Sequence, residues 1–198
     1  MPAMIRLATP HDAAGVQAIY APVVRDTAIS FELEPPTVED MQKRIVAVVE
    51  RMPWLVCEHH GEILGYAYAS PHRVRAAYQW SVDVSVYVNP RAHRSGVGRA
   101  LYTSLLRLLT LQGFYNAYAG ITLPNAASVG LHEAVGFVPV GVYRNVGFKL
   151  GAWHDVGWWS RLLHPLATRP PSPVDLPALA GHPEVQTALK LGQPHLRI

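Results

Sequence analysis

Cysteine is nearly absent from this chain of 198 residues, since Cys57 is the only one. A single thiol excludes an intrachain disulfide and a zinc site built from several cysteines. This composition fits a reducing compartment, so we expect a cytoplasmic protein without a metal site. Cys57 lies between Val56 and Glu58 in a strand-like run, which predicts a small buried residue rather than a reactive nucleophile.

Long apolar runs and a strong charge of one sign are also absent. No uninterrupted apolar stretch reaches the roughly 18 residues of a membrane-spanning helix, and the opening MPAMIRLATPHDAAG lacks the pattern of a secretion signal. The 17 Lys and Arg residues exceed the 14 Asp and Glu residues by three. This charge is too small for a nucleic-acid footprint but suits one small anionic ligand. We therefore expect neither a nucleic-acid nor a membrane partner.

Strand-like and helical patterns alternate through most of the chain. Apolar residues recur at helical spacing from Ala14, after Thr37, from Gly98 to Leu111 and from Asn125 to Ala134, and β-branched or aromatic runs separate them. Thr37, with Asp40 three residues later, is the predicted N-cap of the second helix. The order predicts a mixed α/β domain that contains a tight hairpin at Gly61. The predicted strands are 5–7, 28–33, 54–58, 63–69, 80–88, 116–122, 137–143 and 154–162.

The composition changes near residue 165. Seven of the 17 prolines lie from Pro165 onward, and no core periodicity persists there. We therefore expect one domain over residues 1–164 and a Pro-rich C-terminal tail over residues 165–198. Within the tail, the piece AGHPEVQTALKL is a candidate for a short helix that packs on the domain or on a partner.

The strand ending near Val88 leads into a helix through a basic turn with two glycines. Gly96 and Gly98 allow backbone N–H groups to approach a ligand, and the helix N-terminus adds a partial positive charge. Arg94 and Arg99 can neutralise phosphate charge. The dinucleotide motif is excluded because the third glycine is missing, and no Gly-Lys-Ser/Thr triplet follows as in a P-loop. The turn therefore predicts a pyrophosphate site of another kind.

Two motifs of the chain resemble those of the GCN5-related N-acetyltransferases (GNAT). The turn His93-Arg94-Ser95-Gly96-Val97-Gly98 resembles the family's pattern Gln/Arg-x-x-Gly-x-Gly/Ala, which binds the pyrophosphate of acetyl-CoA, and NAAS followed by LHEAVGF resembles its later motif. His93 replaces the usual Gln or Arg, which alters one side-chain contact but not the backbone cradle. The resemblance implies an α/β fold of the α+β type, in which helices flank a mixed, mostly antiparallel sheet that is splayed at the acetyl-CoA strand.

Within that superfamily the chain resembles the phosphinothricin N-acetyltransferase group. The resemblance spans about Ile5 to Trp159 and rests on RMPWLVCEHHGEILGYAYA, RAAYQW, SVYV, LHEAVGF and GFKLGAWHDVGWW. It implies acetyl transfer from acetyl-CoA to the α-amine of a small amino acid or analogue, of the phosphinothricin or methionine sulfoximine type. The neutral amine attacks the thioester directly in this family.

The resemblance also identifies two candidate catalytic residues. An α-ammonium group must lose a proton before it attacks, and the departing thiolate benefits from a proton donor. Asp83 lies where the group has a catalytic glutamate, so it is the candidate base, directly or through a water, with a carboxylate set back by about 1.5 Å. His132 lies where the group has histidine and other members have a tyrosine that protonates the thiolate. The alternatives are that Asp83 is an ordinary polar strand residue and that His132 is merely packed.

Further residues are implied in binding the two substrates. For the amine substrate they are Phe31, Arg73, Arg75 and Tyr78, and the arginine pair suits a carboxylate or a phosphinate. The residues implied in binding acetyl-CoA act largely through their backbone, and the Val88 N–H is available to polarise the carbonyl of the acetyl group. The acetyl-CoA residues are Val86, Tyr87, Val88, His93, Arg94, Ser95, Gly96, Val97, Gly98, Arg99 and Asn125.

The sequence leaves two alternative functions open, and the resemblance also implies an oligomeric state. One alternative is an acetyltransferase for a peptide N-terminus or a polyamine, although a polyamine pocket should be acidic and the Arg73 loop is basic. The other is a CoA-binding regulator that has lost turnover, because Asp83 replaces glutamate. Relatives in this family are commonly homodimers, so the resemblance implies a homodimer with Trp158 and Trp159 as candidate interface residues.

Overall fold

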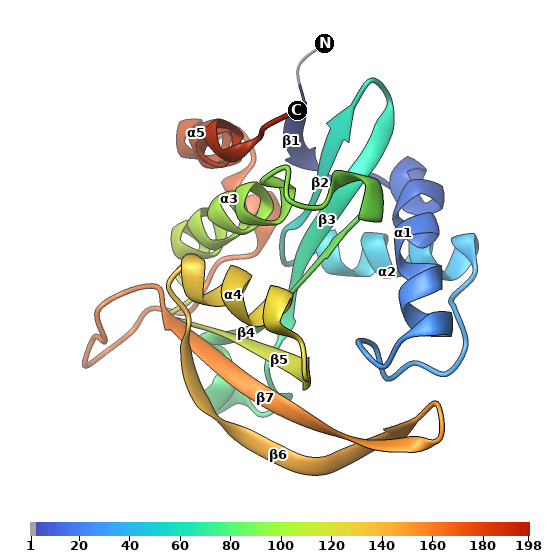
Figure 1. Ribbon diagram of the computed structural model, residues 1–198. Coiled ribbons are helices and arrows are strands. Elements are labelled where there is room, and N and C mark those ends of the chain that lie inside the picture. The colour runs from blue at the N-terminus through green and yellow to red at the C-terminus, as the bar shows by residue number, and fades with distance from the viewer. Residues whose placement is uncertain (1–2) are drawn as a thin grey trace.

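The computed structural model describes residues 3–198 and contains a sheet whose strands pair mostly antiparallel (Figure 1). One sheet has the strand order β1-β2-β3-β4-β5-β7-β6. Only β4 and β5 run parallel to each other, which confirms the expected mixed, mostly antiparallel sheet. The strands are β1 (Met4–Leu7), β2 (Trp54–His59), β3 (Glu62–Pro71), β4 (Ser81–Val88), β5 (Asn116–Leu123), β6 (Val138–Lys149) and β7 (Ala152–Leu162).

Helices cover both faces of the sheet. Thr37 caps α2 as predicted, because its side chain accepts a hydrogen bond from the Asp40 N–H and Asp40 bonds back to Thr37. Figure 1 shows α1 and α2 on one side of the sheet, and α3 and α5 on the other. The helices are α1 (Ala13–Asp26), α2 (Val38–Val49), α3 (Val97–Gln112), α4 (Ala126–Ala134) and α5 (Pro183–Leu191).

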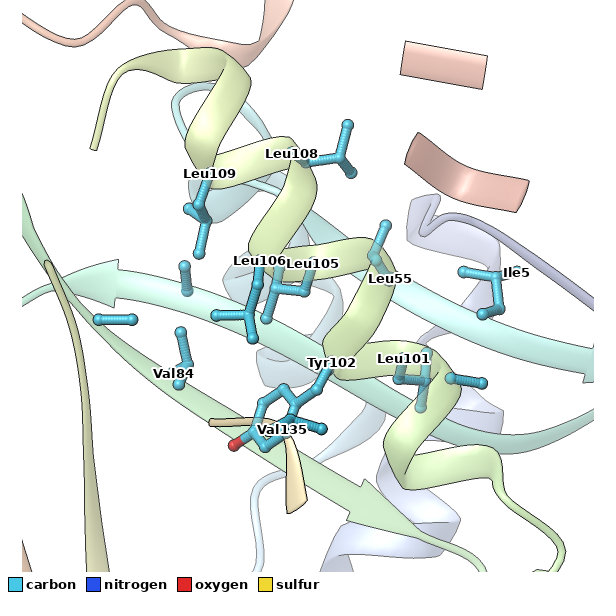
Figure 2. Close-up of a cluster of buried hydrophobic side chains, with 14 of the residues drawn as sticks. Ile5, Leu55, Val84, Leu101, Tyr102, Leu105, Leu106, Leu108, Leu109 and Val135 are labelled. Atoms are coloured by element: carbon cyan, nitrogen blue, oxygen red, sulfur yellow. The ribbon is translucent and has the colours of Figure 1, made fainter. Parts of the chain in front are cut away.

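The two faces of the sheet carry separate hydrophobic cores. Successive side chains of β2 alternate between them, so Trp54 and Val56 pack with α1 and α2, whereas Leu55 and Cys57 pack with α3. Both faces are therefore covered, which explains the nearly continuous apolar run of this strand. Figure 2 shows the leucines of α3 packed over β2 and β4. Cys57 is fully buried, and burial raises the pKa of its thiol to about 11.

The sheet opens between its two parallel strands. The pairing of β4 with β5 covers only three positions and ends where Asp83 pairs with Tyr118. The rest of β4 pairs with β3 alone on its other side, through Val88 opposite Gly65. The strands thus separate along β4, where the resemblance implied that the sheet is splayed.

The strand predicted over residues 28–33 is wrong, since this segment is an irregular loop between α1 and α2. Short side chains there bind locally: Thr27 donates to the Val23 carbonyl and the Glu32 N–H donates to Ser30 Oγ. Lys149 Nζ, from the end of β6, donates to the Ser30 carbonyl over 2.7 Å and also to that of Val24. These bonds compete with strand pairing and fold the segment over the sheet.

The last two strands form a long hairpin that extends beyond both predicted ranges. Gly151, with φ near +77°, lies in the turn between β6 and β7. On β7, Trp159 is buried in the core at 7% exposure, which contradicts the expected interface role of this residue. Period-2 alternation explains the outcome, because Trp158 then faces the opposite side of the sheet.

Helix α5, in the segment after residue 165, packs on the outer side of α3. Within α5, Ala188 and Leu189 are buried and belong to the same core cluster as α3. Ser104 Oγ donates to the Leu189 carbonyl over 3.0 Å, and Arg107 pairs with Glu184 at 2.7 Å. The segment lacks strong periodicity because only one turn of α5 is buried.

Two further findings concern residues 3–198 as described by the structure. None of their helices has the length and apolar character needed to cross a membrane. No group of three or more His, Cys, Asp or Glu side chains among them has an arrangement that could hold a metal ion.

Candidate active site

The opening between β4 and β5 is a cleft whose walls are the two separated strands. Residues 84–87 of β4 line one wall, and residues 120–122 of β5 line the other. Tyr102 and His132 border it from the side of α3 and α4, and Ile29 borders it from the loop after α1. The cleft therefore connects the two faces of the sheet.

Alternation along β4 places different groups on the two faces. Val82 and Val84 pack into the core under α3, so Asp83 and Tyr87 point to the opposite face, over which α1 lies. Tyr87 confirms this direction, because its ring lies 5.0 Å from that of Tyr20 on α1. A substrate that contacts Asp83 thus approaches from the α1 side, while α3 and α4 border the other mouth of the cleft.

The turn before α3 has the shape of an anion cradle. Arg94 and Gly96 have φ of +63° and +83°, so the backbone turns sharply into the helix, with Gly96 as its N-cap. Gly98 lies close to Leu131, since a Cβ built on it would come within 2.9 Å of Leu131 Cδ2. Val97 is 1% exposed and packs in the core, so its side chain is not available to a ligand. First-turn amides and a tight glycine approach fit a pyrophosphate.

Charged side chains surround this cradle. Arg94 and Arg99 are exposed, and within residues 3–198 neither forms an ion pair. His93 Nε2 lies 3.2 Å from the Val88 carbonyl, which joins the turn to the end of β4. Ser95 Oγ donates a hydrogen bond to the Ala92 carbonyl. Arg94 and Arg99 are therefore available to an anion bound at the turn.

The cleft edge of β4 has backbone groups available for pairing. Val86, Tyr87 and Val88 pair with β3 on one side only, and their pairing with β5 has already ended. An extended ligand arm can add there as a strand would. Asn125 reaches the same cleft from the N-cap of α4, where its Oδ1 accepts a hydrogen bond from the Ser128 N–H over 3.1 Å.

Asp83 is hydrogen-bonded to a histidine that the sequence motifs did not single out. His72 Nδ1 lies 2.6 Å from Asp83 Oδ1. Burial raises the pKa of the Asp83 carboxyl, and the bond from His72 acts in the opposite direction. A strand register would have revealed the pair, because Ser70 is opposite Asp83 and the His72 N–H donates to the Ser81 carbonyl. The sequence alone did not supply that register.

His132 lies buried at the other mouth of the cleft, at 4% exposure. Its Nδ1 lies 2.7 Å from the Ser128 carbonyl, which can only accept, so the proton is on Nδ1 and Nε2 accepts from the Tyr102 hydroxyl over 2.9 Å. Burial lowers the pKa of His132 and raises that of Tyr102. At neutral pH the pair therefore consists of a neutral imidazole and a protonated phenol, and Tyr102 is a residue that sequence reasoning missed.

The residues predicted for the amine substrate are only partly brought together. Arg73 lies with its guanidinium 5.9 Å from the Trp158 ring, and Tyr78 lies 6.1 Å from the ring of His72, so both surround the Asp83 pair. Phe31 packs against Gly147 of β6. Arg75 is exposed at the N-cap of the turn Ala76–Tyr78, where its carbonyl accepts a hydrogen bond from the Tyr78 N–H over 2.9 Å.

A larger surface hollow lies elsewhere, between α1 and the β2–β3 turn, and Arg6, Asp12 and Glu58 are among its lining residues. None of the predicted site residues lines it. Arg6 pairs with Asp12 at 2.6 Å and with Glu58 at 2.8 Å, so these charged side chains neutralise one another. The chemistry-bearing residues gather in the β4–β5 cleft instead.

Comparisons with known proteins agree with this geometry. A family model described as an acetyltransferase (GNAT) domain matches residues 5–158. The chain is 42% identical over 174 residues to the phosphinothricin N-acetyltransferase of Streptomyces viridochromogenes, covering 87% of this chain and 95% of that one. It is 33% identical over 172 residues to an L-methionine sulfoximine/L-methionine sulfone acetyltransferase of Pseudomonas paraeruginosa, covering 86% and 100%.

A solved structure extends the agreement to the fold. The GNAT superfamily phosphinothricin acetyltransferase of Sinorhizobium meliloti, in complex with AcCoA, has a TM-score of 0.82 at 34% identity and covers 88% of this chain and 96% of that chain. The family match spans more than half of the chain, and the relatives are covered almost completely. The chain therefore belongs to the GNAT acetyltransferase family and is an N-acetyltransferase.

Proposed function

We propose that this protein transfers the acetyl group of acetyl-CoA to the α-amine of a small amino acid analogue of the phosphinothricin or methionine sulfoximine type. The observation that carries the proposal is the cleft between β4 and β5, which opens where their pairing ends at Asp83 and runs along the unpaired edge of β4. Named relatives that act on phosphinothricin and on methionine sulfoximine support the substrate class.

Acetyl-CoA supplies the activated acetyl group when it is bound. The N–H groups of Gly96, Val97 and Gly98 face its pyrophosphate, with Arg94 and Arg99 neutralising charge. The pairing edge at 86–88 holds the pantetheine arm. Asn125 borders the same arm from α4. His93 and Ser95 shape the turn, since their side chains already bond to the Val88 and Ala92 carbonyls.

Proton transfers occur at the two mouths of the cleft. Asp83 is the carboxylate that drives proton removal from the α-ammonium group, because it lies at the apex of the splay on the α1 side. On the other side Tyr102 and His132 border the mouth where the thiolate departs, and the Tyr102 hydroxyl donates its one proton to His132 Nε2. His132 is thus a positioning residue, since its lowered pKa disfavours a charged imidazole.

The acidic end of the substrate binds on the α1 side of the sheet. Arg73 is the cation nearest the Asp83 pair, held by its bond from Nη1 to the His72 carbonyl at 2.7 Å. Tyr78 and Phe31 supply aromatic surface, and Arg75 is a second cation on the same loop. A basic loop favours a carboxylate or phosphinate over a polyamine.

The assembly we propose is a cytoplasmic homodimer formed through β6. This strand is an edge of the sheet, and almost all of its residues are exposed. Unpaired edges with apolar side chains are surfaces that proteins cover. Sedimentation of the protein tests the assembly, and replacement of Val140 and Val142 by lysine should shift a dimer to a monomer. The exposed large apolar side chains of β6 are Val138, Val140, Val142, Tyr143, Val146 and Phe148.

Thiol release from acetyl-CoA tests the proposed reaction. The amines are phosphinothricin, methionine sulfoximine, methionine sulfone, polyamines and short peptides. Asp83→Ala and His132→Ala are assayed beside Asp175→Ala and His11→Ala, which change exposed residues outside the cleft. We expect turnover with the amino acid analogues, lost only in the first two variants. Acetyl-CoA binding without turnover of any amine would instead indicate a regulator.

A further inference from the structure

His72 occupies the point where the two parallel strands part. Asp83 and Tyr118 are the last pair between β4 and β5. His72 contacts both of them: its Nδ1 lies 2.6 Å from Asp83 Oδ1, and its ring stacks on that of Tyr118 with centroids 4.4 Å apart. Its imidazole is therefore at the apex of the cleft, on the face from which the amine approaches.

The ring of His72 is held on several sides. Tyr78 and Trp158 each present a ring edge-on, with centroids 6.1 Å away. The side chain of His72 is only 13% exposed. Such packing fixes the orientation of the imidazole before any substrate binds, as a catalytic group requires.

One nitrogen of this fixed ring remains available. Within residues 3–198, His72 Nε2 makes no hydrogen bond, yet it is not among the buried polar atoms left without a partner, so it reaches solvent. An ionised Asp83 can only accept, which places the proton of neutral His72 on Nδ1. The lone pair of Nε2 is then free to accept a proton, in the arrangement that an Asp–His pair adopts in hydrolases.

We propose that His72 Nε2 is the base that removes the proton from the substrate α-ammonium group, with Asp83 as the residue that positions it. This inference rests on the proposed function and replaces direct or water-mediated proton removal by Asp83. The imidazole compensates for a short acidic side chain, because it carries the basic atom from the Asp83 oxygen forward to Nε2.

The excess proton of the ammonium group moves to His72 Nε2, and the nitrogen lone pair it leaves forms the N–C bond to the acetyl carbon. The C–S bond breaks and its electron pair goes to sulfur. The second proton lost from nitrogen protonates that sulfur, and the proton on His72 returns to solvent. One proton is released for each amide and free thiol formed.

Two substitutions separate the functions of the side chain. His72→Asn keeps a donor toward Asp83 but removes Nε2, and His72→Phe keeps the ring stacked on Tyr118 but removes both nitrogens. We expect each to lower kcat by about 100-fold or more, with the Kd for acetyl-CoA and the melting temperature near those of the parent. His11→Asn, at an exposed residue outside the cleft, is the matched control and should retain full activity.

Chemical rescue distinguishes catalysis from a structural role. Added imidazole should restore the activity of His72→Ala by about tenfold or more and leave the parent and His11→Asn unchanged. A kcat within about threefold of the parent in either folded variant, His72→Asn or His72→Phe, or no rescue of folded His72→Ala, overturns the assignment of His72. Absence of thiol release by the parent with every amine overturns the proposed function as well, so the two failures are distinguishable.

Discussion

The backbone oxygen of His195 lies directly against Gly96, so the C-terminal segment closes over the turn that opens α3. The Arg197 N–H donates to the Ser95 carbonyl over 2.9 Å and holds the same contact. Residues outside the family-matched range 5–158 thus support the predicted pyrophosphate turn. The contact also requires glycine, because a Cβ at residue 96 would collide with the His195 carbonyl.

Gly96→Ala should weaken acetyl-CoA binding and destabilise the protein. The φ of +83° costs an L side chain about 1–2 kcal/mol, and the collision with His195 displaces the turn as well. Titration calorimetry with acetyl-CoA and thermal melting measure the two effects. Gly61→Ala is the matched control, since its φ is +80° with nothing within 4 Å of the added Cβ. It should lower stability alone, and an equal loss of acetyl-CoA affinity in both variants would contradict the explanation.

Leu189→Ala should destabilise the whole domain, because α5 packs on α3 and shares its core cluster. Leu189 is 6% exposed, and deletion of a buried leucine side chain costs about 2–5 kcal/mol. Leu191, two residues later on the same helix, is 48% exposed, so Leu191→Ala should change stability by less than about 0.5 kcal/mol. Urea denaturation followed by tryptophan fluorescence compares them. Similar values for both variants would show that α5 does not stabilise the domain.

Local patterns predicted much of the fold from the sequence. The Thr37 cap, the hairpin at Gly61 and the glycine turn before α3 depend on residues close in the chain, and all are present in the structure. The loop over residues 28–33 was missed because Lys149, more than 110 residues away, binds it. Distant contacts leave no periodic signal in a short window.

The candidate site shows the same division. Motif resemblance identified Asp83 and His132 because single positions match a family pattern. Their partners, His72 and Tyr102, were missed because strand register and helix packing bring them together. The order of the segment after residue 165 also depends on contacts with α3, which its proline-rich composition did not reveal.

Asp83→Asn should abolish most activity without lowering stability at pH 7. Burial raises the folded-state pKa of Asp83, so the folded protein binds this proton more tightly than the unfolded chain, and the ionised carboxylate lowers stability at higher pH. The variant should melt at or above the parent temperature, with kcat reduced about 100-fold or more.

Asp155→Asn provides a contrast of opposite sign. The Asn145 N–H and Arg144 hold the pKa of the Asp155 carboxyl below its usual value, so its ionised form stabilises the folded state above that value. This variant should melt below the parent at pH 7. Differential scanning calorimetry of the three proteins tests both signs, and a lower melting temperature for Asp83→Asn than for Asp155→Asn would contradict the argument.

His132 should make the protein less stable as the pH falls. Burial lowers the pKa of its imidazole, whereas the unfolded value is about 6.5. Between those two values the unfolded chain binds the extra proton and the folded protein does not, so the contribution of His132 to stability is complete above about pH 6.5 and is lost below it.

His132→Gln keeps a polar group facing Tyr102 but does not titrate. The difference in unfolding free energy between parent and variant should therefore shrink from pH 7.5 to pH 5.5, by at most about 1.4 kcal/mol per pH unit. Urea titrations at those pH values measure it, and a constant difference would show that His132 is protonated equally in both states.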